Sequence, residues 1–487
     1  MVSTKDIFIN NQWIEGKGEA FESINPATEA VLARIHSASR DQVDEAITKA
    51  FHSFQMWSRR PQSIRTRYVE IIKEKLESNQ EELAELISLE TGKALWETKL
   101  EVKGLISKID VTIEATQERC VNREFEQNGA RYKLKHKAHG VMAVLGPFNF
   151  PAHLPHGHII PAILAGNTVV FKPSEFTPLV GKKLMELYAE AKLPDGVINM
   201  VQGGGTVGEA LTQHRDINGI LFTGSSKTGF HLSKQFSQES KILALEMGGN
   251  NPLVVGQVDD IDAAVYGIIR SAFISTGQRC SCARRLILVD NEQTDDLLNR
   301  LVEVTSKLKV GNYNEDVFCG PVISKFAQVT LENWQKNLID QGGKPLLEMK
   351  SFRDKGYFLS PGIIEMSQVR GAADEEYFGP LLQVYLVRNL ADAIFLSNTT
   401  NYGLTAGIFT KNEFEFIHYY DFVRAGVINW NMPTTGASSK LPFGGIGQSG
   451  NFRPSAYYAP DYCHYPVAST QSSSLTLPET LLPGVSF

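Results

Sequence analysis

One cysteine of this chain lies in surroundings that suit a nucleophile. Cys280 is flanked by Gly277, Gln278 and Arg279 and by small polar residues, which is unlike an apolar core position. The thiolate is the nucleophilic form of cysteine, and the neighbouring Arg279 would favour it. Cys280 is therefore a candidate for covalent catalysis, with a structural cysteine as the alternative.

Two other residues supply groups that a cysteine-based reaction needs. Glu246 ends an apolar run and precedes two glycines, a position that suits a general base or a carboxylate that caps a helix. Asn149 lies between two turns bracketed by prolines. Its amide would either donate to an oxyanion or cap a turn.

A glycine-rich stretch gives a weaker signal. Gly203, Gly205 and Gly208 form a G-x-G-x-x-G sequence after an apolar run. A dinucleotide site also requires an acidic residue about 20 positions further on, where the next strand ends. Thr223 and Gly224 stand there instead, so these glycines alone do not establish a phosphate site.

A group of histidines resembles a metal site only superficially. His153, His156 and His158 lie close together, without a carboxylate or cysteine at ligand spacing. Cys280 and Cys282 lack the partner cysteines of a zinc site. We therefore predict no metal.

The elements that must position these residues follow from the hydrophobic pattern. The first hundred-odd residues are predicted to be mainly helical, with a capping box formed by Ser39 and Gln42. From Val141 onward, short apolar runs alternate with helical segments, which predicts βαβ units, buried parallel sheets and two α/β units beside a cleft. The runs are VMAVLGP, NTVVFKPS, INMVQGGG, GILFTGSS, NPLVVG, RRLILV, LLQVYLV, AGIF and GVINW.

A basic strand interrupts this pattern. Basic residues alternate with other residues from Arg131 to Lys137, which predicts a strand with one basic face. It is either an edge strand whose lysines prevent unwanted pairing or a strand that pairs with another subunit. The segment after Tyr465, rich in Ser, Thr and Pro, is predicted to be an extended arm.

The composition excludes several classes of protein. The 487 residues carry a net charge of -6, with 42% hydrophobic and 21% charged residues. These values exclude a disordered chain and give no basic surface for nucleic acid or membrane binding. We find no signal peptide and no apolar run of about 18 residues. Five sparse cysteines make a disulfide framework improbable, so we expect a soluble cytoplasmic protein.

Seven motifs occur in the order found in the aldehyde dehydrogenase superfamily, and the resemblance covers about residues 7–468. They are GPFNFP, FKPSEFTP, FTGSSKTG, LEMGGNNP, GQRCSCARR, EEYFGP and LPFGGIGQSG. Two longer segments, 153–178 and 428–463, look like the branch of this family that oxidises N-succinylglutamate 5-semialdehyde in bacterial arginine breakdown.

The resemblance implies a role for each candidate residue. Cys280 would attack the aldehyde to give a thiohemiacetal, and Asn149 and the Cys280 backbone N–H would hold the oxyanion. Hydride transfer to the nicotinamide would leave a thioester, and Glu246 would activate the water that hydrolyses it.

The resemblance also implies NAD as the cofactor. Glu175 would accept hydrogen bonds from ribose hydroxyls and repel a 2′-phosphate, which favours NAD over NADP. Glu376 would hold the nicotinamide ribose with Phe378 beside the ring, and Gly224 and Ser225 would open the helix that faces the pyrophosphate. The full set of implied cofactor contacts is Lys172, Glu175, Gly224, Ser225, Ser226, Lys227, Thr228, Gly229, Glu376 and Phe378.

The substrate site is less determined by the sequence. A succinylated semialdehyde carries two carboxylates, so Arg279, Arg453 and His153 are candidates for binding it, or else surface or packing residues. The alternatives are a dehydrogenase of another semialdehyde, such as succinate semialdehyde, a CoA-acylating enzyme, and a catalytically silent relative. The presence of Glu246 favours hydrolysis over transfer to CoA.

The implied fold class is α/β, with two doubly wound parallel-sheet domains and a small β element for bridging and oligomerisation. The NAD-binding domain would span 1–125 and 141–248, and the catalytic domain 249–443. Residues 126–140 and 444–487 would form the bridging arm. We therefore expect a homodimer or larger homo-oligomer that acts on a small aldehyde, without nucleic acid or membrane partners.

Overall fold

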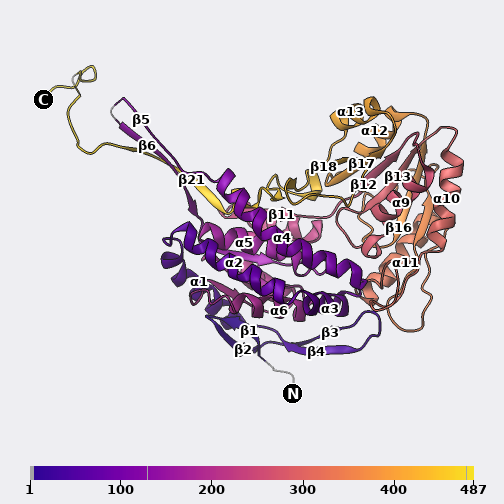
Figure 1. Ribbon diagram of the computed structural model, residues 1–487, viewed down its shortest axis with the longest axis horizontal. Coiled ribbons are helices and arrows are strands. Elements are labelled where there is room, and N and C mark those ends of the chain that lie inside the picture. The colour runs from indigo at the N-terminus through magenta and orange to yellow at the C-terminus, as the bar shows by residue number, and fades with distance from the viewer. Residues whose placement is uncertain (1–4, 129, 479) are drawn as a thin grey trace.

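The computed structural model contains two seven-stranded sheets in separate lobes, together with a projecting β arm (Figure 1). It describes residues 5–128, 130–478 and 480–487. Residues 1–4, 129 and 479 belong to the segments predicted as 1–125, 126–140 and 444–487, and they lie outside the described residues.

The first sheet has the order β11-β10-β7-β8-β9-β1-β2. Its five parallel strands are β7 (Val141–Leu145), β8 (Thr168–Lys172), β9 (Ile198–Met200), β10 (Ile217–Thr223) and β11 (Ile242–Glu246). Strands β1 (Lys5–Ile9) and β2 (Gln12–Glu15) add an antiparallel edge. Every residue of β7 and β8 is buried, as expected for a parallel sheet covered on both faces.

Helices cover this sheet. They are α1 (Arg40–Trp57), α2 (Gln62–Ser78), α3 (Gln80–Thr91), α4 (Leu95–Arg119), α5 (His153–Ala165), α6 (Pro178–Ala189), α7 (Gly205–Gln213) and α8 (Ser226–Gln235). The capping box at Ser39 and Gln42 is confirmed at the start of α1. Four short strands that the hydrophobic pattern does not predict precede this helix, namely β1, β2, β3 (Ala20–Ile24) and β4 (Val31–His36).

The second sheet has the order β14-β15-β16-β13-β12-β17-β18. Its strands are β12 (Asn251–Val255), β13 (Ala283–Val289), β14 (Lys344–Leu347), β15 (Gly362–Glu365), β16 (Leu381–Val387), β17 (Thr405–Phe409) and β18 (Val427–Trp430). Its helices are α9 (Ile261–Ala272), α10 (Thr294–Ser306), α11 (Lys325–Asp340), α12 (Leu390–Asn398) and α13 (Glu413–Phe422). Only β14 is antiparallel to its neighbour, and each predicted apolar run forms a strand. The predicted α/β fold class with two parallel-dominated sheets is confirmed.

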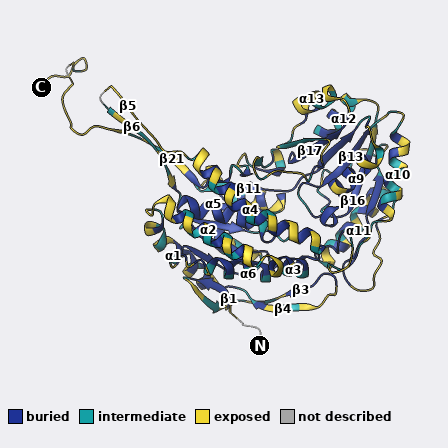
Figure 2. Cartoon of the chain, viewed as in Figure 1, coloured by how far each residue is buried: buried dark blue, intermediate teal, exposed yellow. Residues whose placement is uncertain are grey.

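The strand predicted over 131–137 is confirmed, but its interpretation as an edge strand is wrong. The arm is a three-stranded sheet in which β6 (Ala130–Ala138) lies between β5 (Arg123–Gln127) and β21 (His464–Gln471). Both sides of β6 are thus paired within the chain, so the free edges belong to β5 and β21. The arm projects from the first lobe, and β5 is exposed throughout (Figure 2).

Short elements complete the chain near the site. They are η1 (Ile274–Gly277), β19 (Pro442–Phe443), η2 (Gly447–Ser449), β20 (Ser455–Ala456) and α14 (Ala459–Tyr462). An isolated antiparallel bridge joins Glu246 to Gly450, so the C-terminal segment contacts the end of β11. In the part of the chain that the structure describes, no helix is long and apolar enough to cross a membrane.

Candidate active site

The topology of the first sheet creates a crevice at the carboxyl ends of its strands. From β7 the chain proceeds to β8 and β9 on one side, whereas β10 and β11 lie on the other. The loops that follow β7 and β10 therefore diverge, and ligands bind at such a switch point. Asn149 follows β7, and Gly224 and Ser225 follow β10.

A cavity of about 750 Å³ opens at this place, a size typical of cofactor sites. It brings together most of the predicted site residues, from elements far apart in the sequence. Those that line it are Asn149, Lys172, Glu175, Gly224, Ser225, Thr228, Glu246, Cys280, Glu376 and Phe378. Gly205 and Gly208 of the glycine-rich stretch line it too.

Six predicted residues do not line this cavity. Three lie on α8: Ser226 donates to the Gln448 carbonyl at 3.0 Å, Lys227 is exposed, and Gly229 packs against Met247. The other three are the substrate candidates Arg279, Arg453 and His153.

The N-terminus of α8 opens toward the cavity. The Ser225 side chain accepts from the Thr228 N–H at 3.3 Å and so caps the helix. A β-carbon at Gly229 would lie 2.2 Å from the Met247 sulfur, so glycine allows the helix to approach β11 closely. The free N–H groups and the helix dipole make this end suitable for an anionic group.

Cys280 lies in a strained loop between η1 and β13. Ser275 and Thr276 have φ values of 54° and 56°, a left-handed conformation that is rare without glycine, and Gly277 follows at 71°. Arg284, which the sequence analysis missed, braces this loop by donating to the carbonyls of Gly277 at 2.7 Å and Arg279 at 2.9 Å.

The surroundings of the Cys280 thiol favour its protonated form. Burial, together with the charges of Glu376 and Glu246, raises its pKa to about 12, and Arg284 acts in the opposite direction. Arg284, and not the expected Arg279, is the arginine that most lowers this pKa. The Arg279 guanidinium instead binds Glu97 at 2.9 Å and the Ser275 hydroxyl at 2.8 Å.

Glu246 ends β11 as a buried carboxylate. Its side chain is only 4% exposed, and neither oxygen has a hydrogen-bond partner of good geometry among the described residues. Burial raises its pKa well above the ordinary value, and this is offset in part by the Ser455 backbone N–H and by Lys108. A carboxylate with a raised pKa suits a general base.

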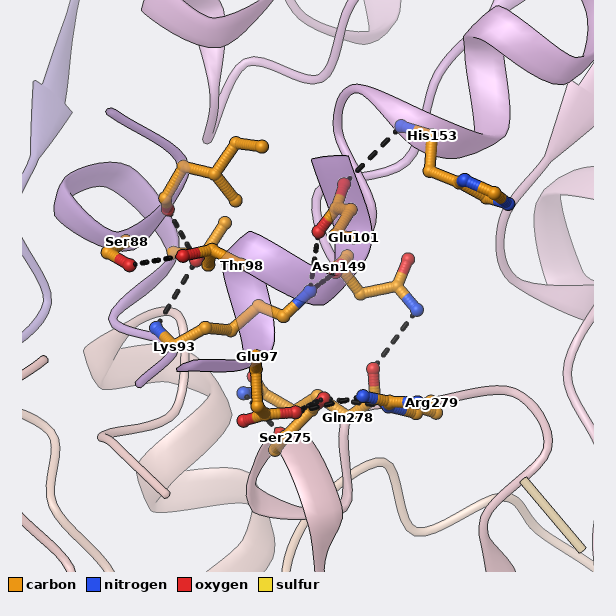
Figure 3. Close-up of polar contacts among 12 residues, drawn as sticks. Ser88, Lys93, Glu97, Thr98, Glu101, Asn149, His153, Ser275, Gln278 and Arg279 are labelled. Atoms are coloured by element: carbon orange, nitrogen blue, oxygen red, sulfur yellow. Dashed lines mark hydrogen bonds and ion pairs between the residues drawn. The ribbon is translucent and has the colours of Figure 1, made fainter. Parts of the chain in front are cut away.

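Asn149 lies directly beside the residues that precede Cys280. Its Nδ2 donates to the Gln278 carbonyl at 3.0 Å, and its own carbonyl accepts from Lys93 Nζ at 2.9 Å (Figure 3). The amide has a second N–H, which is free for an oxyanion.

Two carboxylates and a lysine complete the cavity. Glu376 accepts from the Gly249 N–H at 3.2 Å, and a β-carbon at Gly248 would lie 1.7 Å from its Oε2. Lys172 is buried and donates to the carbonyls of Pro173 and Gly203, both at 2.7 Å. Its Nζ lies 3.6 Å from Glu175, so these two residues form one polar wall.

None of the three predicted substrate residues presents a free charge to the cavity. Arg279 is engaged by Glu97. Arg453 is exposed, does not line the cavity and acts electrostatically on His139, although the backbone N–H of Ser455, two residues further on, reaches Glu246. Burial, followed by the charge of Lys108, holds the pKa of His153 well below its ordinary value.

Lys108 of α4 is a residue that the sequence analysis missed. Its side chain is buried, and its ammonium group has no hydrogen bond or ion pair to another described residue. Burial lowers its pKa to about 8, and Glu246 partly opposes this. A β-carbon at Gly157 would lie 2.4 Å from its Nζ, so α5 leaves room for the ammonium group. No local signal separates Lys108 from the other lysines of α4.

The other histidines of the cluster have protein partners. His156 is hydrogen-bonded to Tyr188 at 2.6 Å, and His158 to Tyr462 at 2.9 Å and Thr223 at 3.1 Å. In the described ranges, no group of His, Cys, Asp and Glu has the arrangement of a metal site.

Comparisons with known proteins agree with this geometry. The sequence profile of the aldehyde dehydrogenase family matches residues 13–465. The N-succinylglutamate 5-semialdehyde dehydrogenase of Chromobacterium violaceum is 49% identical over 98% of this chain and 99% of its own. The protein of the same name from Photorhabdus laumondii is 47% identical over 99% and 98%.

Solved structures show the same fold. The methylmalonate-semialdehyde dehydrogenase of Oceanimonas doudoroffii superimposes with a TM-score of 0.93 at 27% identity, covering 98% of this chain and 99% of the other. The betaine aldehyde dehydrogenase of Staphylococcus aureus, solved in complex with NAD+, gives a TM-score of 0.92 at 26% identity over 99% and 97%.

Proposed function

The chain belongs to the aldehyde dehydrogenase family, and we propose that it oxidises N-succinyl-L-glutamate 5-semialdehyde to N-succinyl-L-glutamate with NAD, in arginine catabolism. The observation that carries this proposal is the single cavity that joins Cys280, Glu246 and Asn149 to the end of α8. Two dehydrogenases named for this substrate are 49% and 47% identical to this chain over nearly its full length, which supports the choice of aldehyde.

The residues of the cavity fit NAD. Ser225 and Thr228 lie at the free end of α8, where a pyrophosphate would accept from backbone N–H groups. Lys172 and Glu175 form the wall that would bind the adenosine ribose, and Glu376 with Phe378 would bind the nicotinamide riboside. When bound, NAD accepts the hydride that leaves the substrate carbon.

Cys280 and Asn149 carry the first part of the proposed reaction. The thiol transfers its proton to the Glu246 carboxylate, which releases it to solvent before the second part of the reaction. The sulfur bonds to the aldehyde carbon, which gives a thiohemiacetal with negative charge on oxygen. The free N–H of the Asn149 amide and the Cys280 backbone N–H stabilise this charge. Loss of one such donor typically lowers turnover by about 10²–10³-fold.

Glu246 carries the second part. After oxidation the acyl group is a thioester on Cys280. Glu246 takes a proton from water, the water oxygen attacks the thioester carbon, and the C–S bond breaks to release the acid and the thiolate. The unpartnered oxygens of Glu246 are available to bind such a water.

Lys108 is the cation that we assign to one substrate carboxylate. A buried ammonium without an anion costs several kcal/mol, and a bound carboxylate would repay it. Lys108 does not line the cavity, but it interacts electrostatically with both Glu246 and His153, so it lies near the reacting groups. This assignment takes precedence over Arg279, whose charge is already paired.

The division into parts remains a proposal. The first sheet supports an NAD-binding domain over 1–125 and 141–248, and the second supports a catalytic domain over 249–443. The pairing of β5 and β6 with β21 supports an arm built from 126–140 and 444–487, which would join subunits of a homo-oligomer. Five free cysteines support a cytoplasmic location.

The first experiment follows NADH formation by the purified protein with N-succinylglutamate semialdehyde, succinate semialdehyde and a neutral aliphatic aldehyde, with and without CoA. We expect a strong preference for the succinylated substrate and no dependence on CoA. Equal rates with all three aldehydes would remove the substrate assignment but keep the chemistry. Activity only with CoA would contradict the hydrolytic role of Glu246.

A further inference from the structure

Three buried charged residues at the start of α4 contact both loops that carry the proposed chemistry. Lys93 precedes the helix, and Glu97 and Glu101 lie on it one turn apart, so both carboxylates share a face. The exposed fractions are 4% for Lys93, 2% for Glu97 and 4% for Glu101. Figure 3 shows Glu101 and Lys93 reaching the Asn149 loop, and Glu97 reaching the loop that leads to Cys280.

The Lys93–Glu101 ion pair holds the Asn149 loop. Lys93 Nζ lies 2.7 Å from Glu101 and donates to the Asn149 carbonyl at 2.9 Å. The same Nζ lies 3.8 Å from the centre of the Phe150 ring, a cation–π contact. Glu101 also accepts from the His153 N–H at 3.3 Å, so the loop is fixed at both of its ends.

Stability alone does not explain the Lys93–Glu101 ion pair. Burying two charges costs several kcal/mol each, and an apolar pair of similar volume often stabilises a fold as well or better. What the ion pair adds is a fixed direction for the Asn149 backbone. Because the Asn149 Nδ2 is also tied to the Gln278 carbonyl, the amide is held from two sides, and its remaining N–H has a defined orientation.

Glu97 holds the other loop. One of its oxygens accepts from the Ser275 hydroxyl at 2.6 Å and from Arg279 at 2.9 Å. Ser275 is the first of the left-handed residues before Cys280, a conformation that persists only when its surroundings enforce it. Glu97 therefore fixes the loop at Ser275 and also pairs with Arg279, the residue next to Cys280.

We propose that the start of α4 positions the two halves of the reaction centre, with the Lys93–Glu101 pair orienting the oxyanion donor Asn149 and Glu97 orienting the loop of Cys280. The proposal rests on the function proposed above. All three are positioning residues, because none of them touches the reacting atoms.

The test compares two reactions of the same cysteine. Aldehyde oxidation passes through an oxyanion, whereas alkylation of Cys280 by iodoacetamide displaces iodide and forms none. The variant Lys93→Met/Glu101→Gln removes both charges together, so no buried charge is left unpaired. We expect kcat to fall up to about 100-fold, the value typical of a donor misplaced by an ångström, with KM for NAD and the alkylation rate unchanged.

The variant Glu97→Ala releases the Cys280 loop. We expect it to lower kcat and also to raise the alkylation rate, because a loosened loop exposes the thiol and eases its ionisation. Ser275→Ala, which removes one hydroxyl, gives the same test if Glu97→Ala does not fold. Lys99→Met on the same helix is the matched control, since Lys99 pairs with Glu81 at the surface at 2.7 Å.

Two results would overturn the proposal. One is a Lys93→Met/Glu101→Gln variant that keeps the wild-type kcat, or whose Cys280 alkylation slows as much as aldehyde oxidation does. The other is a Glu97→Ala or Ser275→Ala variant that alkylates at the wild-type rate. A wild-type protein that oxidises none of the aldehydes contradicts the proposed function instead, and the alkylation rates still test the role of Glu97.

Discussion

Burial, together with the charges of Glu376 and Glu246, raises the pKa of the Cys280 thiol to about 12, and Arg284 acts in the opposite direction. The neighbouring base, Glu246, also has a raised pKa because of burial. Burial therefore shifts both groups toward their protonated forms. At the scale of single residues, the site suppresses a permanent thiolate and depends on a base to form it during the reaction.

The first prediction concerns this thiol. Because its pKa lies far above neutrality, the thiolate fraction of the free protein rises about tenfold per pH unit, and so does the rate of alkylation by iodoacetamide. We expect this increase without a plateau between about pH 7 and pH 9. Alkylation followed by mass spectrometry of the Cys280 peptide measures it, with Cys280→Ser as the control. A plateau within that range would contradict the prediction.

The second prediction concerns substrate charge. A charge-assisted hydrogen bond contributes about 1.5–3 kcal/mol, which corresponds to about 10–100-fold in binding. Lys108→Met should raise KM for N-succinylglutamate semialdehyde by this factor and leave KM for a neutral aldehyde nearly unchanged. Arg453→Ala, the candidate from sequence, should change neither, because the exposed Arg453 charge is screened by solvent and acts on His139 instead of on the groups of the cavity. Equal effects of Lys108→Met on both aldehydes would exclude Lys108 as the carboxylate ligand.

At the scale of elements, the approach of α8 to β11 defines the proposed cofactor site. Gly229 allows this approach, because any side chain there would meet the sulfur of Met247. Glu246 lies at the end of the same strand, one residue before Met247. A shift of α8 would therefore disturb cofactor binding and the base together.

The third prediction is that Gly229→Ala raises KM for NAD about tenfold and lowers the melting temperature, because overpacking costs about 1–3 kcal/mol. Gly204→Ala is the control, since a β-carbon there meets no atom within 4 Å and its φ is −83°. Steady-state kinetics at varied NAD and a thermal melt provide the readouts. An unchanged KM for NAD in Gly229→Ala would show that α8 does not set the affinity.

At the scale of the whole molecule, the arm extends away from both lobes (Figure 1). Its sheet has two free edges, and Phe125 of β5 stacks on Tyr132 of β6 with ring centres 5.2 Å apart while remaining 55% exposed. An exposed aromatic pair on a projecting sheet is typical of a surface that another subunit covers.

The fourth prediction is that the protein is a homodimer or larger assembly and that Phe125→Asp weakens it. A charge on this face would lose the apolar burial and would be desolvated in the interface. Size-exclusion chromatography with light scattering should show a shift to smaller species, with unchanged circular dichroism. Lys99→Met, far from the arm, should leave the mass unchanged. An assembly of the same mass in Phe125→Asp would exclude the arm face as the contact.

The sequence by itself determined the features that depend on near neighbours. The apolar runs identified most of the parallel strands of both sheets, because burial on two faces requires continuous hydrophobic residues. It also identified Asn149, Glu246 and Cys280, since each lies in a short motif at or near the end of such a run. The cavity that these residues share follows from the carboxyl ends of parallel strands meeting at one edge.

The tertiary structure decided what depends on distant partners. Arg279 is 182 residues from Glu97, and Asn149 is 129 residues from Gln278, so no local pattern reveals these contacts. Strand β6 is the central strand of the arm sheet because β21, from the far end of the chain, pairs with the edge of β6 that β5 leaves free. The roles of Arg284, Lys93 and Lys108 likewise depend on which segments enclose them. A buried charged side chain either donates to loop carbonyls, as Arg284 and Lys93 do, or is available to bind a ligand, as we propose for Lys108.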